Sequence, residues 1–287
     1  MNINSICVCG AGTMGSGIAQ ASAQAGFSTL LFDPIPNVLE KAKAGMEKNL
    51  QSLTEKGKIN TAEKTKILQR IRFTDDVQIC QADIFIEAII ENLEIKIGLF
   101  NQLAELNHSE CVFASNTSSL SITKIAAGVV SPQRVIGMHF FNPASIMKLV
   151  EVIRTDYTDE QTTLMVIDLA NAMGKTAVLC KDSPGFIVNR VARPYYIESL
   201  RLAEGAISSF EQTDRLLEAT GFKMGPFKLM DLIGNDVNYA VSCSVFEQLN
   251  EPERLRPSLI QQQKVKEGKL GKKSGEGYYK YSPIPLP

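Results

Sequence analysis

Residues Ile3 to Asp33, INSICVCGAGTMGSGIAQASAQAGFSTLLFD, carry the pattern from which the fold class follows. A short apolar run ends at Cys9, and the glycine pattern of residues 10–15, GAGTMG, follows it at once. A helical pattern then continues to about Gly26, and a second apolar run ends at Asp33. A strand, a glycine turn, a helix and a second strand that ends in an acid together predict a dinucleotide-binding βαβ unit.

Each glycine of this pattern has its own physical role. Gly10 allows the tight turn, Gly12 lets a pyrophosphate approach the backbone, and Gly15 permits close packing of the helix on the strand. The helix then begins near Thr13 and Met14, where unsatisfied N–H groups and the positive end of the helix dipole attract phosphates. We therefore expect residues 10–15 to bind the cofactor phosphates.

Asp33 is expected to bond the ribose hydroxyls of the adenosine half and to repel a 2′-phosphate. No arginine directly follows it, so the sequence favours NAD over NADP. The alternative is a purely structural glycine turn in which Asp33 caps a loop.

Composition excludes several classes of protein. The 287 residues are 44% hydrophobic and 21% charged, enough for a substantial core, in one large or two ordinary domains. With 30 basic and 31 acidic residues the net charge is −1, which predicts no general attraction to nucleic acid or to a membrane surface. No apolar run approaches the roughly 18 residues of a membrane span.

Two histidines and six cysteines without a CxxC pair predict no zinc cluster and no other metal site. Cys7 and Cys9 alternate with apolar residues, so they are interpreted as small core residues. The amino terminus lacks the pattern of a signal peptide. Together these features predict a soluble, cytoplasmic protein.

Residues 37–70 are interpreted as two helices broken near residues 57–60, inserted between strands. Its lysines include those at positions 41, 43, 48, 56 and 58. Contact with a nucleotide phosphate and an ordinary solvated helix pair both stay open as explanations.

Further strands and helices alternate along the chain. An apolar strand from Ile84 is closed by Glu91, and a helix from Glu94 to Leu106 follows with apolar residues on one face. Glu91 and Lys96 are expected at the ligand side of the sheet. The next strand, residues 111–114, runs into the polar sequence SNTSS, in which one residue suffices to cap a helix. The others are expected either to hold substrate or nicotinamide, or to have only a capping role.

The stretch Val135 to Val152, VIGMHFFNPASIMKLVEV, contains His139 at the end of one apolar run and Glu151 inside another. Each is costly to bury alone, so together they suggest a base and the carboxylate that orients it. The strand at residues 148–154 follows a loop without a crossover helix, which favours antiparallel pairing. A helix near residues 159–173 and a strand at residues 176–180 complete the series.

The fold class that follows is α/β: a Rossmann-type, doubly wound, mainly parallel sheet followed by an all-α C-terminal domain. We place the NAD-binding domain at residues 1–183, with the helical insertion near 37–70. The helical domain covers residues 184–287 and has no convincing strands. Its tail, residues 281–287, is expected to be surface structure.

Seven motifs also carry a family resemblance over nearly the whole chain: GAGTMGSGIAQ, EAIIENLEIK, ASNTSSL, GMHFFNPASIMKLVEV, KDSPGFIVNR, TGFKMGPFKLMDLIG and KSGEGYYKY. With these motifs the sequence resembles the L-3-hydroxyacyl-CoA dehydrogenase family, particularly its stand-alone bacterial 3-hydroxybutyryl-CoA dehydrogenase branch. The most specific of them is HFFNP with a glutamate twelve residues after its histidine.

The resemblance implies roles for individual residues. His139 would be the acid/base and Glu151 its orienting carboxylate, while Ser118 and Asn189 would contact the substrate. On the cofactor side, four further residues would lie along the nicotinamide half: Glu91, Lys96, Asn116 and Asn142. In the family a serine and a lysine of the helix pair contact CoA, and these positions are Asn49 and Lys56 here. A second departure is Lys228, which stands where an acid is common and puts any pairing there in doubt.

The implied reaction is the reversible NAD-dependent oxidation of an (S)-3-hydroxyacyl-CoA, with short-chain 3-hydroxybutyryl-CoA expected as substrate. A histidine suits the proton transfer because its reference pKa, about 6.5, lies near working pH. Butyrate metabolism, β-oxidation and other fatty acid metabolism all use such chemistry. The resemblance also implies a homodimer through the helical domain. The alternatives are a dehydrogenase of a free 3-hydroxy acid such as L-gulonate, and a non-catalytic NAD-binding protein.

Overall fold

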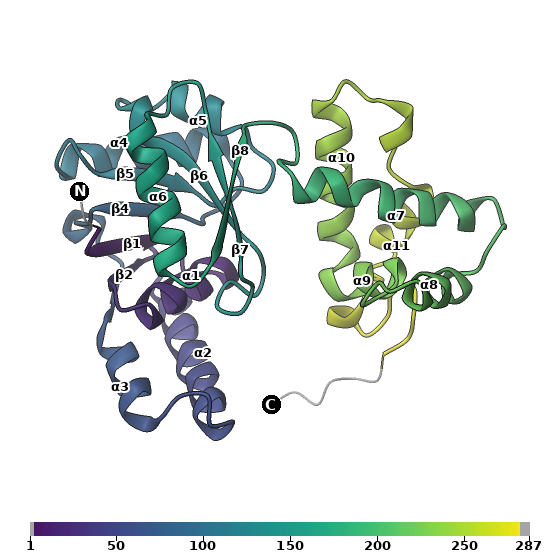
Figure 1. The fold of residues 1–287 in the computed structure, drawn as a ribbon, viewed down its shortest axis with the longest axis horizontal. Coiled ribbons are helices and arrows are strands. Elements are labelled where there is room, and N and C mark those ends of the chain that lie inside the picture. The colour runs from purple at the N-terminus through teal and green to yellow at the C-terminus, as the bar shows by residue number, and fades with distance from the viewer. Residues whose placement is uncertain (1–2, 282–287) are drawn as a thin grey trace. The chain divides into compact units, whose positions relative to one another are not determined.

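The computed structural model describes residues 3–281, which form two compact units that divide between Asp182 and Ser183. The first contains a sheet flanked by helices, and the second is helical (Figure 1). The predicted fold class is confirmed. The expected surface tail lies mostly outside the described residues, since only its first residue, Tyr281, belongs to them.

The first unit is built on one sheet with the strand order β3-β2-β1-β4-β5-β6-β7-β8. Its strands are β1 (Ser5–Cys9), β2 (Ser28–Phe32), β3 (Ile71–Thr74), β4 (Ile84–Glu87), β5 (Val112–Ser115), β6 (Val135–Phe140), β7 (Leu149–Arg154) and β8 (Thr176–Lys181). All neighbours are parallel except β6 and β7, whose antiparallel pairing agrees with the expectation from the missing crossover helix. The order reverses between β1 and β4, and the carboxyl ends of strands at such a switch point are where these sheets bind ligands.

Helices cover both faces of this sheet (Figure 1). They are α1 (Thr13–Gln24), α2 (Pro36–Glu55), α3 (Thr61–Gln69), α4 (Leu93–Leu106), α5 (Ile122–Ala127) and α6 (Glu160–Ala172), with short 3₁₀ turns at η1 (Val77–Ile79) and η2 (Pro132–Arg134). Alternation along a strand assigns side chains to the two faces. Ile84 and Ile86 of β4 join the core that includes α1, α2 and α6, whereas Phe85 stacks on Phe113 at 5.7 Å on the other face.

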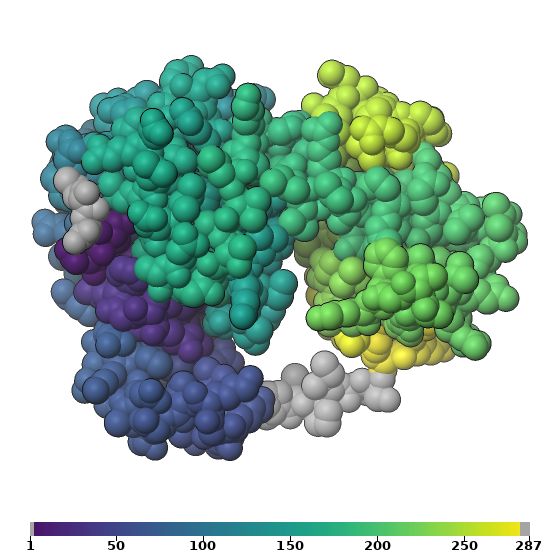
Figure 2. All heavy atoms as spheres, in the orientation of Figure 1, coloured from purple at the N-terminus to yellow at the C-terminus, as the bar shows by residue number. Residues whose placement is uncertain are grey.

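The inserted helix pair has local causes. Gly57 adopts φ of 66° just after α2 ends, and Asn60 then caps α3. The Asn60 side chain accepts the Glu63 N–H at 2.9 Å, and the Glu63 carboxylate accepts the Asn60 N–H at 2.8 Å. These two helices protrude from the sheet as the blue region of Figure 2. The strand β3 that follows them was missed by the sequence interpretation.

The second unit contains α7 (Val188–Glu204), α8 (Phe210–Ala219), α9 (Pro226–Ile233), α10 (Asn235–Gln248) and α11 (Leu259–Lys266), with 3₁₀ turns at η3 (Glu253–Leu255) and η4 (Lys272–Ser274). Its apolar cores are small, one around Phe227 and Tyr278 and one around Ile197 and Val245. Interiors of this size leave much of the stability to polar contacts.

Two buried carboxylates supply such contacts and explain two of the motifs. Asp231, from the MGPFKLMD segment, accepts the main-chain N–H groups of Tyr278 and Tyr279 at 2.9 and 3.0 Å and the Tyr281 hydroxyl at 2.9 Å. A Cβ at Gly277 would lie 1.9 Å from the same carboxylate, so the GEGYYKY segment needs glycine there. The MGPFKLMD and GEGYYKY segments are therefore joined by the hydrogen bonds of the Asp231 carboxylate.

Asp214 is the second buried carboxylate, and it caps the start of α9. Its oxygens accept the N–H groups of Phe227 and Lys228 at 2.9 and 3.0 Å. The doubt about Lys228 is resolved, because its ammonium pairs with Glu218 at 2.8 Å. That ion pair is partly exposed and contributes little to stability.

Candidate active site

The candidate site lies at the carboxyl edge of the sheet, where the sequence placed its functional residues. The glycine loop follows β1, Glu91 follows β4, and the polar turn of residues 115–119 follows β5. Because β7 runs antiparallel to β6, the first residues of β7 lie beside the last residues of β6. This arrangement puts His139 directly opposite Glu151 in the ladder.

His139 and Glu151 form a buried pair. The Nδ1 atom lies 2.7 Å from Glu151 Oε2, and the residues are 5% and 1% exposed. A carboxylate accepts but does not donate, so Nδ1 carries the hydrogen in this contact. The imidazole also packs against Phe141, with ring centroids 4.6 Å apart. The orientation of the ring is therefore set on two sides, and Nε2 is the nitrogen suited to exchange a proton with a ligand.

The negative charge of Glu151 also affects the nearby Cys180 thiol. Burial, and then the Glu151 and Asp182 carboxylates, raise the pKa of the Cys180 thiol to about 12. A buried carboxylate of this kind stabilises a positive charge that forms beside it, and the imidazolium of His139 is such a charge.

The glycine loop fits a dinucleotide. Gly10 has φ of 98°, and a Cβ there would lie 2.6 Å from the Ala88 carbonyl oxygen. A Cβ at Gly15 would lie 1.7 Å from the Gly10 carbonyl oxygen, so the protein itself requires both glycines. At Gly12, by contrast, nothing lies within 4 Å of the added atom. That position is exposed at the N-terminus of α1, next to Thr13 and Met14, where a phosphate finds free space and helix N–H groups.

Asp33 lies at the end of β2 and helps to shape this loop. Its Oδ2 accepts the Ala11 N–H at 2.8 Å, and its Oδ1 accepts the Ile35 N–H at 3.0 Å. Each carboxylate oxygen can accept more than one hydrogen bond, so ribose hydroxyls fit the remaining positions. Asp33 thus has a loop-capping role, the alternative considered from sequence, and that role is compatible with ribose binding.

Glu91 and Lys96 are brought together, and they are joined by Glu87, which the sequence interpretation did not select. The Lys96 ammonium lies 2.5 Å from Glu87 Oε1 and 3.1 Å from Glu91 Oε2. Burial opposes ionisation of Glu91. The Lys96 charge and the hydroxyl donors Thr117 and Ser119 outweigh it and hold the Glu91 pKa below its usual value.

The polar turn has divided roles. Thr117 and Ser119 both donate to Glu91, the latter at 2.8 Å, and Ser121 rather than a residue of the SNTSS run caps α5. Asn116 accepts the Phe140 N–H at 2.8 Å, which ties the turn to the strand that carries His139. Ser118 is half-buried between the two Glu91 donors.

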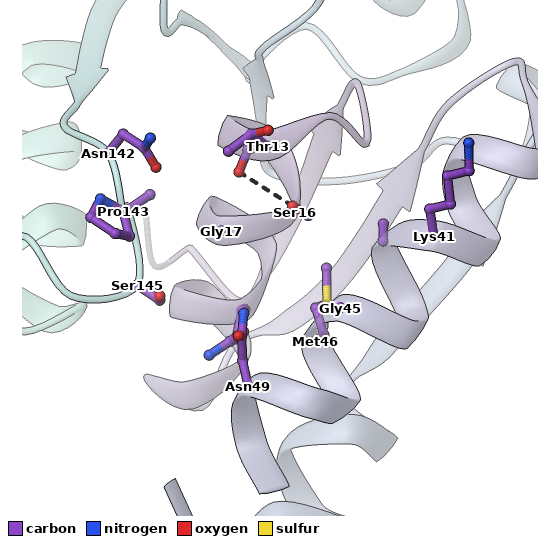
Figure 3. Close-up of a pocket in the computed structure, with 13 residues that line it drawn as sticks. Thr13, Ser16, Gly17, Lys41, Gly45, Met46, Asn49, Asn142, Pro143 and Ser145 are labelled. Atoms are coloured by element: carbon purple, nitrogen blue, oxygen red, sulfur yellow. Dashed lines mark hydrogen bonds between the residues drawn. The ribbon is translucent and has the colours of Figure 1, made fainter. Parts of the chain in front are cut away.

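A cavity of about 240 Å³ opens between α1, α2 and the loop of residues 142–145 (Figure 3). Three sequence-predicted residues line it, one from each side: Thr13, Asn49 and Asn142. Lys41 adds a positive charge on α2. Lys56 is not part of this lining and lies exposed at the C-cap of α2.

The loop between His139 and Glu151 is held by Lys175, a second residue that the sequence interpretation missed. Its ammonium donates to the carbonyl oxygens of Ala144 and Met147 at 2.6 and 2.9 Å, and desolvation lowers its pKa. On its other side the loop meets α1, because a Cβ at Gly17 would lie 3.2 Å from that of Ala144.

Asn189, the remaining expected substrate contact, belongs to the second unit. It lies in the first turn of α7, and its main-chain carbonyl accepts Arg193 Nε at 2.9 Å. Burial lowers the pKa of Arg193 to about 10.

Two family models match this chain. The 3-hydroxyacyl-CoA dehydrogenase NAD binding domain matches residues 5–183, and the 3-hydroxyacyl-CoA dehydrogenase C-terminal domain matches residues 185–281. The chain belongs to the 3-hydroxyacyl-CoA dehydrogenase family. This family consists of NAD-dependent oxidoreductases, and NAD is accordingly the cofactor of the first unit.

Named members of the 3-hydroxyacyl-CoA dehydrogenase family resemble the whole chain. A 3-hydroxyadipyl-CoA dehydrogenase of Escherichia coli is 46% identical over 97% of this chain, which spans only 59% of that longer protein. A probable 3-hydroxybutyryl-CoA dehydrogenase of Deinococcus radiodurans is 41% identical over 96% of this chain and 99% of its own length. The crystal structure of an (S)-3-hydroxybutyryl-CoA dehydrogenase from Ralstonia eutropha, 36% identical, has a TM-score of 0.93 over 98% of this chain and 100% of that one.

Residues 3–281 contain no cluster of three or more His, Cys, Asp or Glu side chains arranged to hold a metal ion. Within the same part of the 3-hydroxyacyl-CoA dehydrogenase chain, no helix has the length and apolar content needed to cross a membrane.

Proposed function

We propose that this chain catalyses the reversible NAD-dependent oxidation of a short-chain (S)-3-hydroxyacyl-CoA, with 3-hydroxybutyryl-CoA as the first candidate, to the 3-oxoacyl-CoA. The observation that carries the proposal is the buried His139–Glu151 pair, 2.7 Å apart, at the carboxyl edge of a NAD-binding domain. A relative named for 3-hydroxybutyryl-CoA aligns over nearly its full length, which favours that substrate.

In the proposed reaction His139 removes the hydroxyl proton through Nε2 while Nδ1 stays bonded to Glu151. Glu151 stabilises the imidazolium that results, and this stabilisation explains a carboxylate that is only 1% exposed. NAD, when bound, accepts the hydride from C3 of the hydroxyacyl group. In the reverse direction His139 returns its proton to the oxygen of the 3-oxo group.

The remaining residues bind and orient. Ser118 and Asn189 hold the reacting oxygen, and Asn142 and Asn116 lie along the nicotinamide half. Asn49 is proposed to contact CoA, supported by its place in the cavity beside α1. Lys56 is proposed as a second CoA contact, through its exposed ammonium. The phosphates of NAD are held by the glycine loop and the adenosine ribose by Asp33.

A second substrate is favoured by one specific observation. The relative named 3-hydroxyadipyl-CoA dehydrogenase is 46% identical over 97% of this chain. Its named substrate differs from 3-hydroxybutyryl-CoA by a longer acyl chain that ends in a carboxylate. A 3-hydroxyadipyl-CoA is therefore the second candidate.

We also propose that the chain is a homodimer formed through the helical unit and that it works in the cytoplasm, in fatty acid or butyrate metabolism. Large apolar side chains are exposed on that unit, among them Val191, Ile207, Leu216 and Leu259. Exposed apolar surface of this kind is commonly covered by a partner.

All six cysteines are free thiols, which suits a reducing compartment.

The experiment that tests the substrate is NADH oxidation with a series of 3-oxo compounds. The series contains acetoacetyl-CoA, 3-oxohexanoyl-CoA, 3-oxodecanoyl-CoA, 3-oxoadipyl-CoA and free acetoacetate. The proposal expects the highest kcat/KM with acetoacetyl-CoA and negligible turnover of the free acid. A preference for 3-oxoadipyl-CoA would select the second candidate, and turnover of free acids alone would overturn the acyl-CoA assignment.

A further inference from the structure

Glu87 occupies the carboxyl end of β4, at the centre of the sheet, and its side chain is 0% exposed. In the ladders it lies opposite Cys9 of β1 and Ser115 of β5. The glycine loop begins immediately after Cys9, and the polar turn begins at Ser115. Glu87 therefore lies between the roots of the two loops from which the cofactor site is built.

The Glu87 carboxylate holds the root of the polar turn and the segment that follows β4 through hydrogen bonds. Oε2 accepts the Ser115 hydroxyl at 2.6 Å, and Oε1 accepts the Ile89 N–H at 2.7 Å. Oε1 also accepts from the Lys96 ammonium at 2.5 Å. Three donors around a fully buried carboxylate account for the cost of removing it from water.

Lys96 points into the protein and not toward solvent. It is 1% exposed, and its ammonium is shared by Glu87 in the interior and Glu91, whose side chain is 38% exposed. The three charged groups form one row from the core of the sheet to the surface of the site. In this position Lys96 acts on a ligand through Glu91.

The charges in this row do not cancel. Two carboxylates and one ammonium give a formal charge of −1. Because Glu87 already neutralises Lys96 in the interior, the excess negative charge is left at the exposed end, on Glu91. If Lys96 faced Glu91 alone, that end of the row would be neutral.

We propose that Glu87 is a positioning residue that neutralises Lys96, leaves a net negative charge on Glu91 toward the cofactor, and thereby favours the oxidised nicotinamide over the reduced one. The oxidised ring carries a positive charge and the reduced ring carries none, so a nearby negative charge distinguishes the two by Coulomb attraction. The inference rests on the proposed function, in which Glu91 lies beside the nicotinamide half. It gives Glu87 a role in setting the redox balance of the bound cofactor.

The test measures the dissociation constants of NAD⁺ by calorimetry and of NADH by fluorescence, and takes the ratio Kd(NAD⁺)/Kd(NADH). Glu87→Gln keeps the acceptor oxygen and makes the row neutral, so the ratio should rise on the order of tenfold. Lys96→Met removes the only ammonium of the row and leaves Glu87 with its Ser115 and Ile89 donors, so the row becomes more negative and the ratio should fall. The double variant restores −1, and its ratio should return to within about threefold of the original.

A matched control is Glu105→Gln, which removes one exposed negative charge from the same helix, α4, and should leave the ratio unchanged. A purely structural role for Glu87 would weaken both nucleotides together and leave the ratio constant in every variant, which would overturn the inference. If Glu87→Gln does not fold, the dissociation constants are compared among Lys96→Met, the double variant and the unmodified protein. These comparisons still show whether the ratio Kd(NAD⁺)/Kd(NADH) changes in the expected direction.

Turnover on acetoacetyl-CoA by the unmodified protein separates this inference from the proposed function. A constant ratio in a protein with normal turnover would overturn the role of Glu87 and leave the function intact. The expected ratios in a protein that does not reduce any 3-oxoacyl-CoA would support the role of Glu87 and contradict the function.

Discussion

Replacing Glu151 by glutamine removes the negative charge beside His139 and preserves the shape of the side chain. The amide oxygen can still accept from Nδ1, so the ring keeps its orientation. The imidazolium formed during proton transfer, however, loses its counter-charge. Because the two residues are 5% and 1% exposed, water cannot replace that charge.

The size of the effect follows from the contact. The two atoms are 2.7 Å apart, which puts the centres of charge roughly 4 Å apart. At an effective dielectric constant of about 20, such a pair attracts by about 4 kcal/mol. If the reaction's transition state carries most of the positive charge, the loss corresponds to about a thousandfold in kcat.

The assay is NADH oxidation with saturating acetoacetyl-CoA near neutral pH, together with the dissociation constant of NADH. We expect a kcat about a thousandfold lower in Glu151→Gln and an unchanged affinity for NADH. Glu160→Gln, an exposed carboxylate in the first turn of α6, is the matched control and should keep full turnover. A Glu151→Gln variant within tenfold of the original kcat would refute the electrostatic role of this carboxylate.

Three further predictions concern other parts of the structure. Gly12→Ala should keep its melting temperature, since the Gly12 φ of −67° suits alanine and no atom lies within 4 Å of the added Cβ. The variant should bind NAD about tenfold more weakly, because the new methyl group occupies the space of the pyrophosphate. Unchanged affinity for NAD would contradict the phosphate assignment. Asp231→Asn should lower the free energy of unfolding by about 2–4 kcal/mol, because it removes the charge of a buried hydrogen-bond acceptor. The control Asp236→Asn loses a partly exposed ion pair with a lysine and should lower it by less than about 1 kcal/mol. Equal losses would show that the buried carboxylate does not hold the carboxyl-terminal segment. Lys175→Met should raise amide hydrogen exchange in residues 144–148, measured by mass spectrometry, without changing that of β1; unchanged exchange would mean that the ammonium does not hold the loop.

The parts of the fold that the sequence predicted correctly depend on local patterns. The glycine turn, the helix break before Asn60 and the long amphipathic helices are each written within a few consecutive residues. The antiparallel position of β7 also followed from a local fact, the absence of a crossover helix before Leu149. His139 and Glu151 were selected because a single ionisable residue in an apolar strand needs a partner, and the structure places each opposite the other.

The parts that were missed depend on contacts between distant residues. Strand β3 has four residues, and its alternating pattern is too short to distinguish from a loop without its neighbour β2. Glu87 gave the same signal as Glu151, an acid in an apolar strand, but the sequence did not show that Lys96 and Ser115 would surround it. Lys175 gave no local signal, since the carbonyl oxygens it binds lie about 30 residues earlier.

The catalytic role of His139 is tested by steady-state NADH oxidation with acetoacetyl-CoA by the unmodified protein and by His139→Ala, with NADH affinity measured on both. We expect turnover by the unmodified protein and a loss of several orders of magnitude in kcat for the variant at equal NADH affinity. Full turnover by His139→Ala, or no turnover of any 3-oxoacyl-CoA by the unmodified protein, would contradict it.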